Sequence, residues 1–333
     1  MNFKSILYSA AILALCVACK KNSTETAPTP TLNGTLKIDG LEEFVYPGQK
    51  ITLKPSGITH PNGETVRYYW KVTPGMTKND TTDVFEYTFS DTLRTHTVYC
   101  TAYASGYSSS SIVAYSTTVK GGKDGSLKGI DALQTPIDGT EYYQTVIGTQ
   151  TWLQNNVYEA TSGTPYRNSS LMSDILGKYY NYEDAKAVCE SIDNGNWKLP
   201  SREDWETLET YIKQQNSESY GKTVASALMV NATFNDATMW EYWPSVGTIK
   251  NGSGLSVIPS GYVTLGVKNN STETDYSSGK FEGVYNYATF WTSTQTEDGS
   301  KAYYKYLYLD QPNMLTGVGD KLSFGASVRC IKK

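Results

Sequence analysis

The sequence predicts two folded regions, an all-β sandwich followed by an α+β domain, behind an N-terminal export signal. Residues 34–120 contain short β-prone segments separated by turn residues, without helical periodicity, which is typical of a sandwich. Residues 129–333 combine two helix-start motifs with further β-prone segments. Residues 121–128 lie between them and are predicted to be a linker. The length of 333 residues agrees with two domains.

Residues 1–19 have the features of a signal peptide. Lys4 supplies a positive charge, and the apolar run 6–17 is shorter than the roughly 20 residues of a membrane span. The segment ending at Cys19 resembles a bacterial lipobox, with Cys16 in place of the usual leucine. We expect lipidation of Cys19, because the polar residues 20–33 that follow suit a flexible tether. An ordinary secretory signal cleaved nearby is the alternative.

The predicted sandwich has a β-prone segment at 51–53, and others follow at 67–72, 97–103 and 112–115. The region is similar to the Ig-like or PKD-like modules of bacterial surface proteins, which makes Trp70 its core tryptophan. The segment around Ile51 has no cysteine to meet Cys100, so we expect a buried free thiol there.

The second region, 129–333, opens with a predicted hairpin over 141–154. Asn181 is a suitable N-cap for a first helix, with Asp184 at its third position, and Ser201 with Asp204 predicts the start of a second. An apolar stripe on each helix is expected to face the core: Tyr182, Ala185, Val188, Cys189 and Ile192 on the first, and Trp205, Leu208 and Ile212 on the second. The polar stretches 214–250 and 266–282 are interpreted as surface excursions.

Several motifs of the second region resemble the Fibrobacter succinogenes major paralogous domain. They occur in order at 138–152, 179–185, 197–205, 258–262, 290–294 and 327–330. That family is similar to a distant branch of the C-type lectin-like fold. The resemblance implies two helices, a mostly antiparallel sheet and a Cys189–Cys330 disulfide. With Cys16 removed in the signal peptide and Cys19 assigned to lipid, at most one disulfide forms among the three remaining cysteines.

The residues offer little for catalysis, and we expect no enzyme. The second region has no histidine for a nucleophile–base pair. Formylglycine-generating enzymes share the fold, and Leu199–Trp205 is similar to one of their segments, but they need a redox-active cysteine pair, whereas Cys330 is interpreted as structural. The carboxylates of the second helix are interpreted as dipole-favoured or solvated groups: Glu203, Asp204, Glu206 and Glu209.

Neither a metal nor another cofactor is expected. Gln311-Pro312-Asn313 resembles a calcium motif of sugar-binding lectins, but only Asp310 and Asp320 lie nearby in the sequence, too few carboxylates for Ca²⁺. We therefore expect a turn there. The net charge of −4 disfavours nucleic acid as a partner.

Binding remains as the expected role. Trp240, Tyr242 and Trp243 place three aromatic side chains in one predicted loop, and they are the candidate ligand contacts. The alternative is that they pack locally and hold their own loop.

The sequence thus predicts a non-catalytic envelope protein, anchored by lipid to the outer membrane, that binds a glycan or a cell-surface protein. The cell surface is favoured, and the periplasmic face is the alternative. A structural or assembly component without a small ligand is the competing function, and a formylglycine-enzyme-like catalyst is the third.

Overall fold

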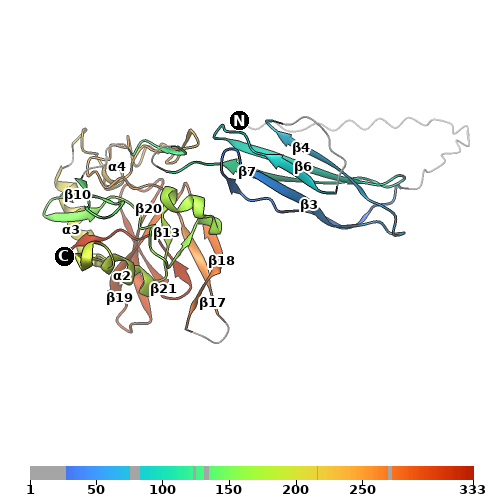
Figure 1. Cartoon of the computed structure of the whole chain (residues 1–333). Helices are drawn as coiled ribbons and strands as arrows, with labels where there is room; N and C mark the ends of the chain where they lie inside the picture. The colour runs from blue at the N-terminus through green and yellow to red at the C-terminus, as the bar shows by residue number, and fades with distance from the viewer. Residues whose placement is uncertain (1–27, 76–82, 123–124, 131–134, 216, 269–271) are drawn as a thin grey trace, which may run out of the picture.

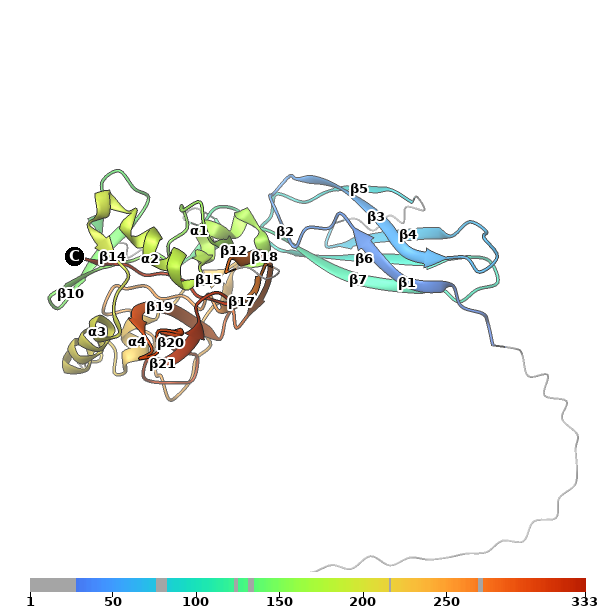
Figure 2. The same ribbon diagram turned by 90° about the horizontal axis from the view of Figure 1, so that it is seen from below.

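The computed structural model describes residues 28–75, 83–122, 125–130, 135–215, 217–268 and 272–333. Figures 1 and 2 show an elongated lobe that carries β1 to β7 and a rounder second lobe, the head, that carries all the labelled helices. The described residues are mostly β, with four α-helices. Residues 1–27, which include Cys19, lie outside the described residues.

The N-terminal lobe is all-β, as predicted. Its strands are β1 (Asn33–Asp39), β2 (Phe44–Val45), β3 (Lys50–Thr59), β4 (Arg67–Thr73), β5 (Phe85–Thr88), β6 (Thr95–Tyr103) and β7 (Ser110–Thr118). They form two sheets, β1-β3-β5 and β2-β7-β6-β4, around one apolar core. Trp70 is buried at its centre and stacks on Phe85 with ring centroids 5.4 Å apart. Cys100 is a buried free thiol, so the predictions for both residues are confirmed.

The head combines short strands with the four helices. Its helices are α1 (Ser173–Leu176), α2 (Tyr182–Glu190), α3 (Arg202–Gln215) and α4 (Val224–Leu228). Its strands are β8 (Leu127–Lys128), β9 (Thr135–Pro136), β10 (Tyr143–Ile147), β11 (Gln150–Leu153), β12 (Thr164–Pro165), β13 (Lys178–Tyr179), β14 (Trp197–Lys198), β15 (Thr233–Phe234), β16 (Ala237–Thr238), β17 (Tyr262–Val267), β18 (Thr274–Glu282), β19 (Tyr287–Gln295), β20 (Lys301–Tyr308), β21 (Leu315–Asp320), β22 (Phe324–Gly325) and β23 (Ile331–Lys332).

Both predicted helix starts are present. The Asn181 side chain accepts a hydrogen bond from the backbone N–H of Asp184 at 2.8 Å and caps α2. Ser201 and Asp204 cap α3 reciprocally, because each side chain accepts from the other residue's N–H, at 3.0 and 2.8 Å. The predicted stripes of both helices are buried.

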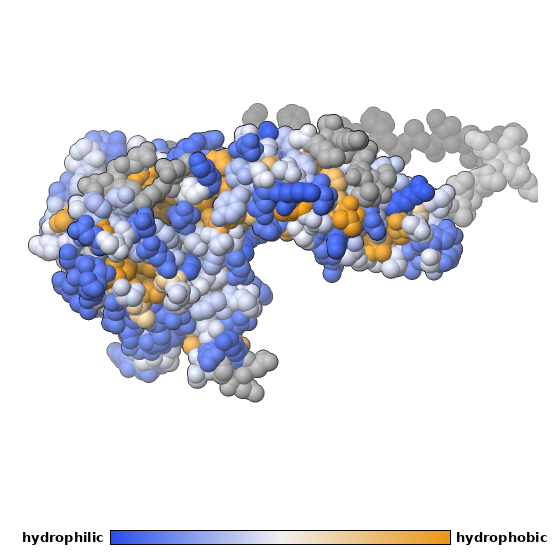
Figure 3. All heavy atoms as spheres, viewed as in Figure 1, coloured by the Kyte–Doolittle hydropathy of each residue, from blue (hydrophilic) through white to orange (hydrophobic). Residues whose placement is uncertain are grey.

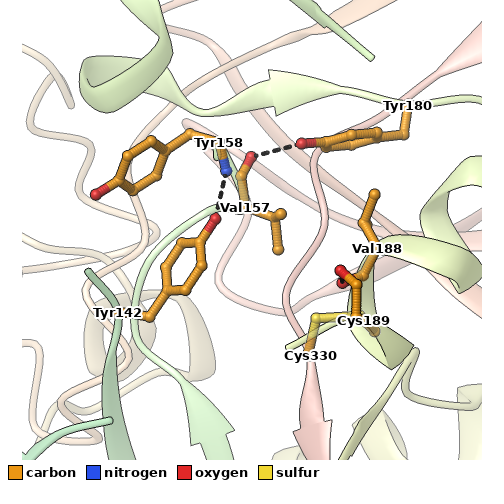
Figure 4. The surroundings of a disulfide bond; sticks show 8 residues. Tyr142, Val157, Tyr158, Tyr180, Val188, Cys189 and Cys330 are labelled. Atoms are coloured by element: carbon orange, nitrogen blue, oxygen red, sulfur yellow. Dashed lines mark hydrogen bonds between the residues drawn. A yellow bond between two sulfur atoms is a disulfide. The ribbon is translucent and has the colours of Figure 1, made fainter. Parts of the chain in front are cut away.

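A disulfide joins α2 to the segment just before β23. Cys189 and Cys330 are bonded across 141 positions of the sequence, as the family resemblance implied. Figure 4 shows Tyr142, Val157 and Tyr180 around the bond. Tyr142 Oη accepts from the N–H of Tyr158 at 3.0 Å, and Tyr180 Oη donates to the Val157 carbonyl at 3.2 Å. The two cysteines and these tyrosines therefore belong to one buried cluster of the head.

Arg329, next to Cys330, is buried with its charge. Its guanidinium donates to the Asn156 side chain at 2.7 Å and to the carbonyls of Leu255 and Ser256 at 2.5 and 3.2 Å, and it also contacts the Gln154 carbonyl. Burial lowers its pKa to about 9, so the group remains a cation at neutral pH. The Arg329 side chain thereby links the segments around residues 155 and 255 to the segment before β23.

The prediction of a surface excursion over residues 214–250 is wrong. All five residues of α4 are buried, and Met239, Trp240 and Val246 are also core residues. The sequence did not reveal this, because the apolar positions occur in short irregular pieces without a helical or strand period. The described parts of the second excursion, 266–268 and 272–282, do lie mostly at the surface, where β18 pairs antiparallel with β17.

The two lobes share a packed seam. Phe44 of the first lobe lies in one apolar cluster with Phe234 and Met172 of the head. Arg167 and Glu43 form an ion pair across the seam at 2.5 Å. Within the segment predicted to be a linker, β8 pairs with β15, and Gly122 donates to Asp174 at 2.8 Å. The described parts of 121–128 are thus bonded to the head.

None of the helices in the described part of the chain is long and apolar enough to span a membrane.

Candidate binding site

The predicted aromatic loop places only two of its three rings at the surface. Trp240 is buried, and its indole N–H donates to the Val257 carbonyl at 2.9 Å, so its ring is not part of the exposed surface of the loop. Tyr242 and Trp243 are 69% and 37% exposed. The Trp243 carbonyl accepts from the N–H of Val246 at 3.0 Å, which closes the loop. A binding role for these two residues stays a prediction.

A larger aromatic surface lies on strand β20, where side chains alternate between two faces. Lys305 and Leu307 point into the core, whereas Tyr304, Tyr306 and Tyr308 lie on the opposite, partly exposed face. Three further rings from β17, β19 and β22 join them. We call these six residues the tyrosine cluster: Tyr262, Tyr287, Tyr304, Tyr306, Tyr308 and Phe324.

The rings of the tyrosine cluster are in mutual contact. Tyr287 stacks on Tyr308, and Tyr304 stacks on Phe324, each pair with centroids 4.6 Å apart. Tyr262 packs edge-on against Tyr287 at 5.8 Å and contacts Phe324 at the same distance. Such pairs stabilise one another beyond the area that they bury. The cluster is therefore a continuous aromatic surface rather than a set of separate side chains.

Two glycines of β21 make room for these rings. A Cβ atom at Gly317 would lie 2.3 Å from the Tyr304 ring, and one at Gly319 would lie 2.7 Å from Phe324. Both distances are shorter than any van der Waals contact. The rings therefore lie across the neighbouring strand, where a side chain would otherwise stand.

The phenols of the cluster can donate and accept hydrogen bonds. Burial raises the pKa of Tyr262, and a hydrogen bond with the Glu282 carboxylate raises it further. Burial likewise raises the pKa of Tyr287, with added repulsion from Tyr308, Tyr306 and Asp310. The surface thus offers aromatic faces, hydroxyl groups and two carboxylates at its edge.

The back of β20 is fixed by a buried ion pair with α3. Lys305 Nζ lies 2.5 Å from Glu209 Oε1 and also donates to Thr316 Oγ1 at 3.2 Å. The interpretation of Glu209 as a solvated or dipole-favoured carboxylate is therefore wrong, because its side chain is buried. Glu203 and Glu206 are exposed. The pair holds the strand that presents Tyr304 and Tyr306.

A second aromatic surface lies on the outer face of β4-β6-β7. Tyr69, Tyr99 and Tyr115 are exposed there on three adjacent strands, together with Val113. Tyr69 stacks on Tyr103 at 4.6 Å. We call this surface the sandwich face.

The segment that resembles a lectin calcium motif forms a turn. The Gln311 N–H donates to the Tyr308 carbonyl at 3.0 Å, and the Pro312 carbonyl accepts from Ala225 at 3.0 Å. The described residues contain no group of three or more histidine, cysteine, aspartate or glutamate side chains placed to hold a metal ion.

These features define a β-rich, two-lobed protein whose disulfide-linked head carries an aromatic surface. The chain belongs to the Fibrobacter succinogenes major domain family, whose match covers residues 146–332, more than half of the chain. No curated protein matches this sequence. The family match lies within the head and includes every residue of the tyrosine cluster.

Proposed function

We propose that this protein is a lipid-anchored cell-envelope protein whose head binds glycans through the tyrosine cluster without catalysing a reaction. The continuous, partly exposed aromatic surface carries the proposal, since surfaces of this kind mark interaction sites. Sugar rings present an apolar C–H face that stacks on aromatic rings. Their hydroxyl groups can pair with the phenols and with Glu282 and Asp310 at the edge.

We also propose a specific fold for each lobe. Two helices, a mostly antiparallel set of strands and a disulfide from α2 to the segment before β23 favour a C-type lectin-like head. The two facing sheets with Trp70 at the centre favour an Ig-like spacer. The spacer would hold the head away from the membrane.

The anchor follows from the sequence before residue 28. A lipid on Cys19 and a short polar tether would attach the chain to the outer membrane, and we favour the cell surface over the periplasmic face. The buried disulfide supports export, because such bonds persist in oxidising compartments.

The same disulfide supports a non-catalytic head. Cys189 and Cys330 are fully buried and bonded to each other, so neither presents a free thiol to a substrate. The formylglycine-enzyme alternative would need such a thiol. Non-reducing mass spectrometry of the exported protein tests this point, and free thiols at both positions would favour the catalytic alternative.

A glycan array probed with residues 20–333 tests the proposed function. We expect the glycans bound by the wild type to be lost from Tyr306→Ala/Tyr308→Ala. The matched control Tyr69→Ala/Tyr115→Ala, on the sandwich face, should retain them, and all variants should melt cooperatively. Equal binding by the cluster variant, or no glycan bound by the wild type, would contradict the proposal. Tyr242→Ala/Trp243→Ala on the same array tests the loop.

A structural or assembly role is the second candidate, and the sandwich face favours it. An exposed row of Tyr69, Tyr99 and Tyr115 on one sheet suits a protein partner, since tyrosine is enriched at interfaces. Sedimentation of the wild type against Tyr115→Glu tests association of this chain with itself. Concentration-dependent assembly that the variant loses would support this role, and a monomer at all concentrations would oppose it.

A further inference from the structure

A cavity of about 470 Å³ lies at the seam of the two lobes. The seam lies where the lobes meet in Figure 3, and apolar side chains are visible along it. The first lobe contributes Phe44, Arg94 and Thr117 to its wall. The head contributes residues from α1, β15, β16 and β18 and from the turn after β18. Neither lobe alone encloses this space.

The wall is mainly apolar and rich in rings. Its aromatic members are Phe44, Tyr166, Phe234, Phe281 and Tyr285, and its aliphatic members include Met172, Leu176, Met239 and Val284. Phe44 contacts both Tyr166 and Phe234, with centroids 6.0 and 6.4 Å apart. The volume falls within the range of about 300–1,000 Å³ that small-molecule sites occupy. An apolar ring bound in the cavity would make dispersion contacts with wall side chains on several sides.

The charges on the wall favour a neutral ligand. The Glu43 carboxylate is matched by Arg167 at 2.5 Å. Arg94 and Glu282, of opposite sign, are the other charged lining residues. An ionised ligand would be desolvated without a full counter-charge, which is costly.

One polar atom at the wall lacks a partner. Asn235 donates through Nδ2 to the Thr118 carbonyl at 3.4 Å, whereas its Oδ1 is buried and accepts no hydrogen bond from the described residues. A buried acceptor left unpaired costs about 1–3 kcal/mol. Because the Nδ2 bond is long at 3.4 Å, a rotation of the amide can turn this acceptor to a hydrogen-bond donor on a ligand, which would remove the cost.

The backbone around the cavity is unusual on the head side. Tyr285 has a φ of +72°, in the left-handed region that a bulky residue rarely adopts, and its N–H donates to the Pro259 carbonyl at 3.0 Å. The conformation places a ring-bearing residue at the wall. Backbone strain of this kind concentrates at ligand-binding positions.

From these observations we infer that the seam cavity binds a small neutral aromatic molecule that carries one hydroxyl or N–H donor. The ring fills the space between the phenylalanine side chains, and the donor pairs with Asn235. The cavity wall contains none of the six rings of the tyrosine cluster, although Glu282 lies at the edge of both, and the inference does not rest on glycan binding.

Fluorescence titration of residues 20–333 with N-phenyl-1-naphthylamine, a neutral aromatic amine, tests the inference. We expect saturable enhancement with the wild type and at least a tenfold weaker affinity in Ala237→Trp and Val284→Trp, which fill the cavity from two sides. The control Val146→Trp places a tryptophan at a position that is 69% exposed and away from the seam, and it should bind as the wild type does.

Absence of saturable binding would overturn the inference, and so would equal affinity in both filling variants. The donor is tested with 1-phenylnaphthalene, which has no N–H. We expect it to bind several-fold more weakly to the wild type, and a smaller difference between the two probes in Asn235→Ala. Equal affinity of the two probes for the wild type would overturn the pairing with Asn235.

Discussion

Lys305 of β20 and Glu209 of α3 form an ion pair with 2.5 Å between Nζ and Oε1, and their side chains are only 4% and 10% exposed. The pair lies directly behind the strand that presents Tyr304 and Tyr306. Burial makes the two charges dependent on each other, because neither has water to replace its partner.

Glu209→Gln should therefore destabilise the head by about 3–5 kcal/mol, since it leaves the Lys305 ammonium buried without a counter-charge. The double replacement Glu209→Leu/Lys305→Met should recover most of this loss. Urea unfolding measures both. Glu86→Gln, which breaks an exposed pair with Lys50 at 2.7 Å, is the control and should change little. A small effect of Glu209→Gln would show that water reaches the pair.

Removal of the disulfide should also be costly. Cys189→Ala/Cys330→Ala is expected to lower the unfolding free energy by about 2–5 kcal/mol, because the bond constrains a long loop of the unfolded chain. The control is Cys100→Ala in the other lobe, which removes a buried sulfur without changing loop closure. Equal stability of wild type and double variant under non-reducing conditions would contradict this expectation.

The Cys100 thiol should be inert in the folded protein. Burial raises its pKa from the ordinary 9.0 to about 12, and only the thiolate reacts with alkylating agents. Iodoacetamide at pH 8 should modify Cys100 in urea and leave it intact in buffer, as peptide mass spectrometry can show. Rapid modification in buffer would mean that the first lobe opens.

The same shift predicts a pH dependence of stability. Between pH 9 and about 12 the unfolded thiol loses its proton while the folded one keeps it, so this group's contribution to stability falls as pH rises. The stability difference between the wild type and Cys100→Ala should therefore narrow from pH 8.5 to pH 11. Denaturant unfolding at the two pH values measures it, and a constant difference would argue against the raised pKa.

Gly317→Ala should damage the tyrosine cluster. The new methyl group would lie 2.3 Å from the Tyr304 ring, so the ring must move, at a cost of about 1–3 kcal/mol. We expect lower stability and weaker glycan binding together. Val318→Ala, at the neighbouring exposed position of β21, should change neither. Unaltered glycan binding by Gly317→Ala would show that Tyr304 is not part of the proposed glycan site.

Local signals allowed much of the head to be predicted. The caps at Asn181 and Ser201 act within four residues of sequence, so the starts of α2 and α3 follow from the residues themselves. The β10–β11 hairpin likewise depends on a two-residue turn. In the first lobe, the β-prone segments predicted β3, β4, β6 and β7, and the resemblance to Ig-like modules implied the buried position of Trp70, whereas β1, β2 and β5 were not predicted.

The features that the sequence did not predict depend on contacts between residues far apart in the chain. The residues around Trp240 are typical of a surface loop, which predicts an exposed ring. In the structure its indole N–H donates to the Val257 carbonyl of a separate segment, and the ring is buried. The tyrosine cluster was not predicted either. The alternation over 303–309 was a visible signal for three of its rings, but Tyr262, Tyr287 and Phe324 reach them only through the tertiary fold.

The closing strand has a consequence for the order in which the head can fold. β23 pairs with both β11 and β14, and Arg329 and Cys330 beside it bond to residues more than 100 positions earlier. Contacts of such long range form late and slowly. β23 lies between β14 and β11 in the five-stranded sheet, so a truncation that removes residues 331–332 would split that sheet in two.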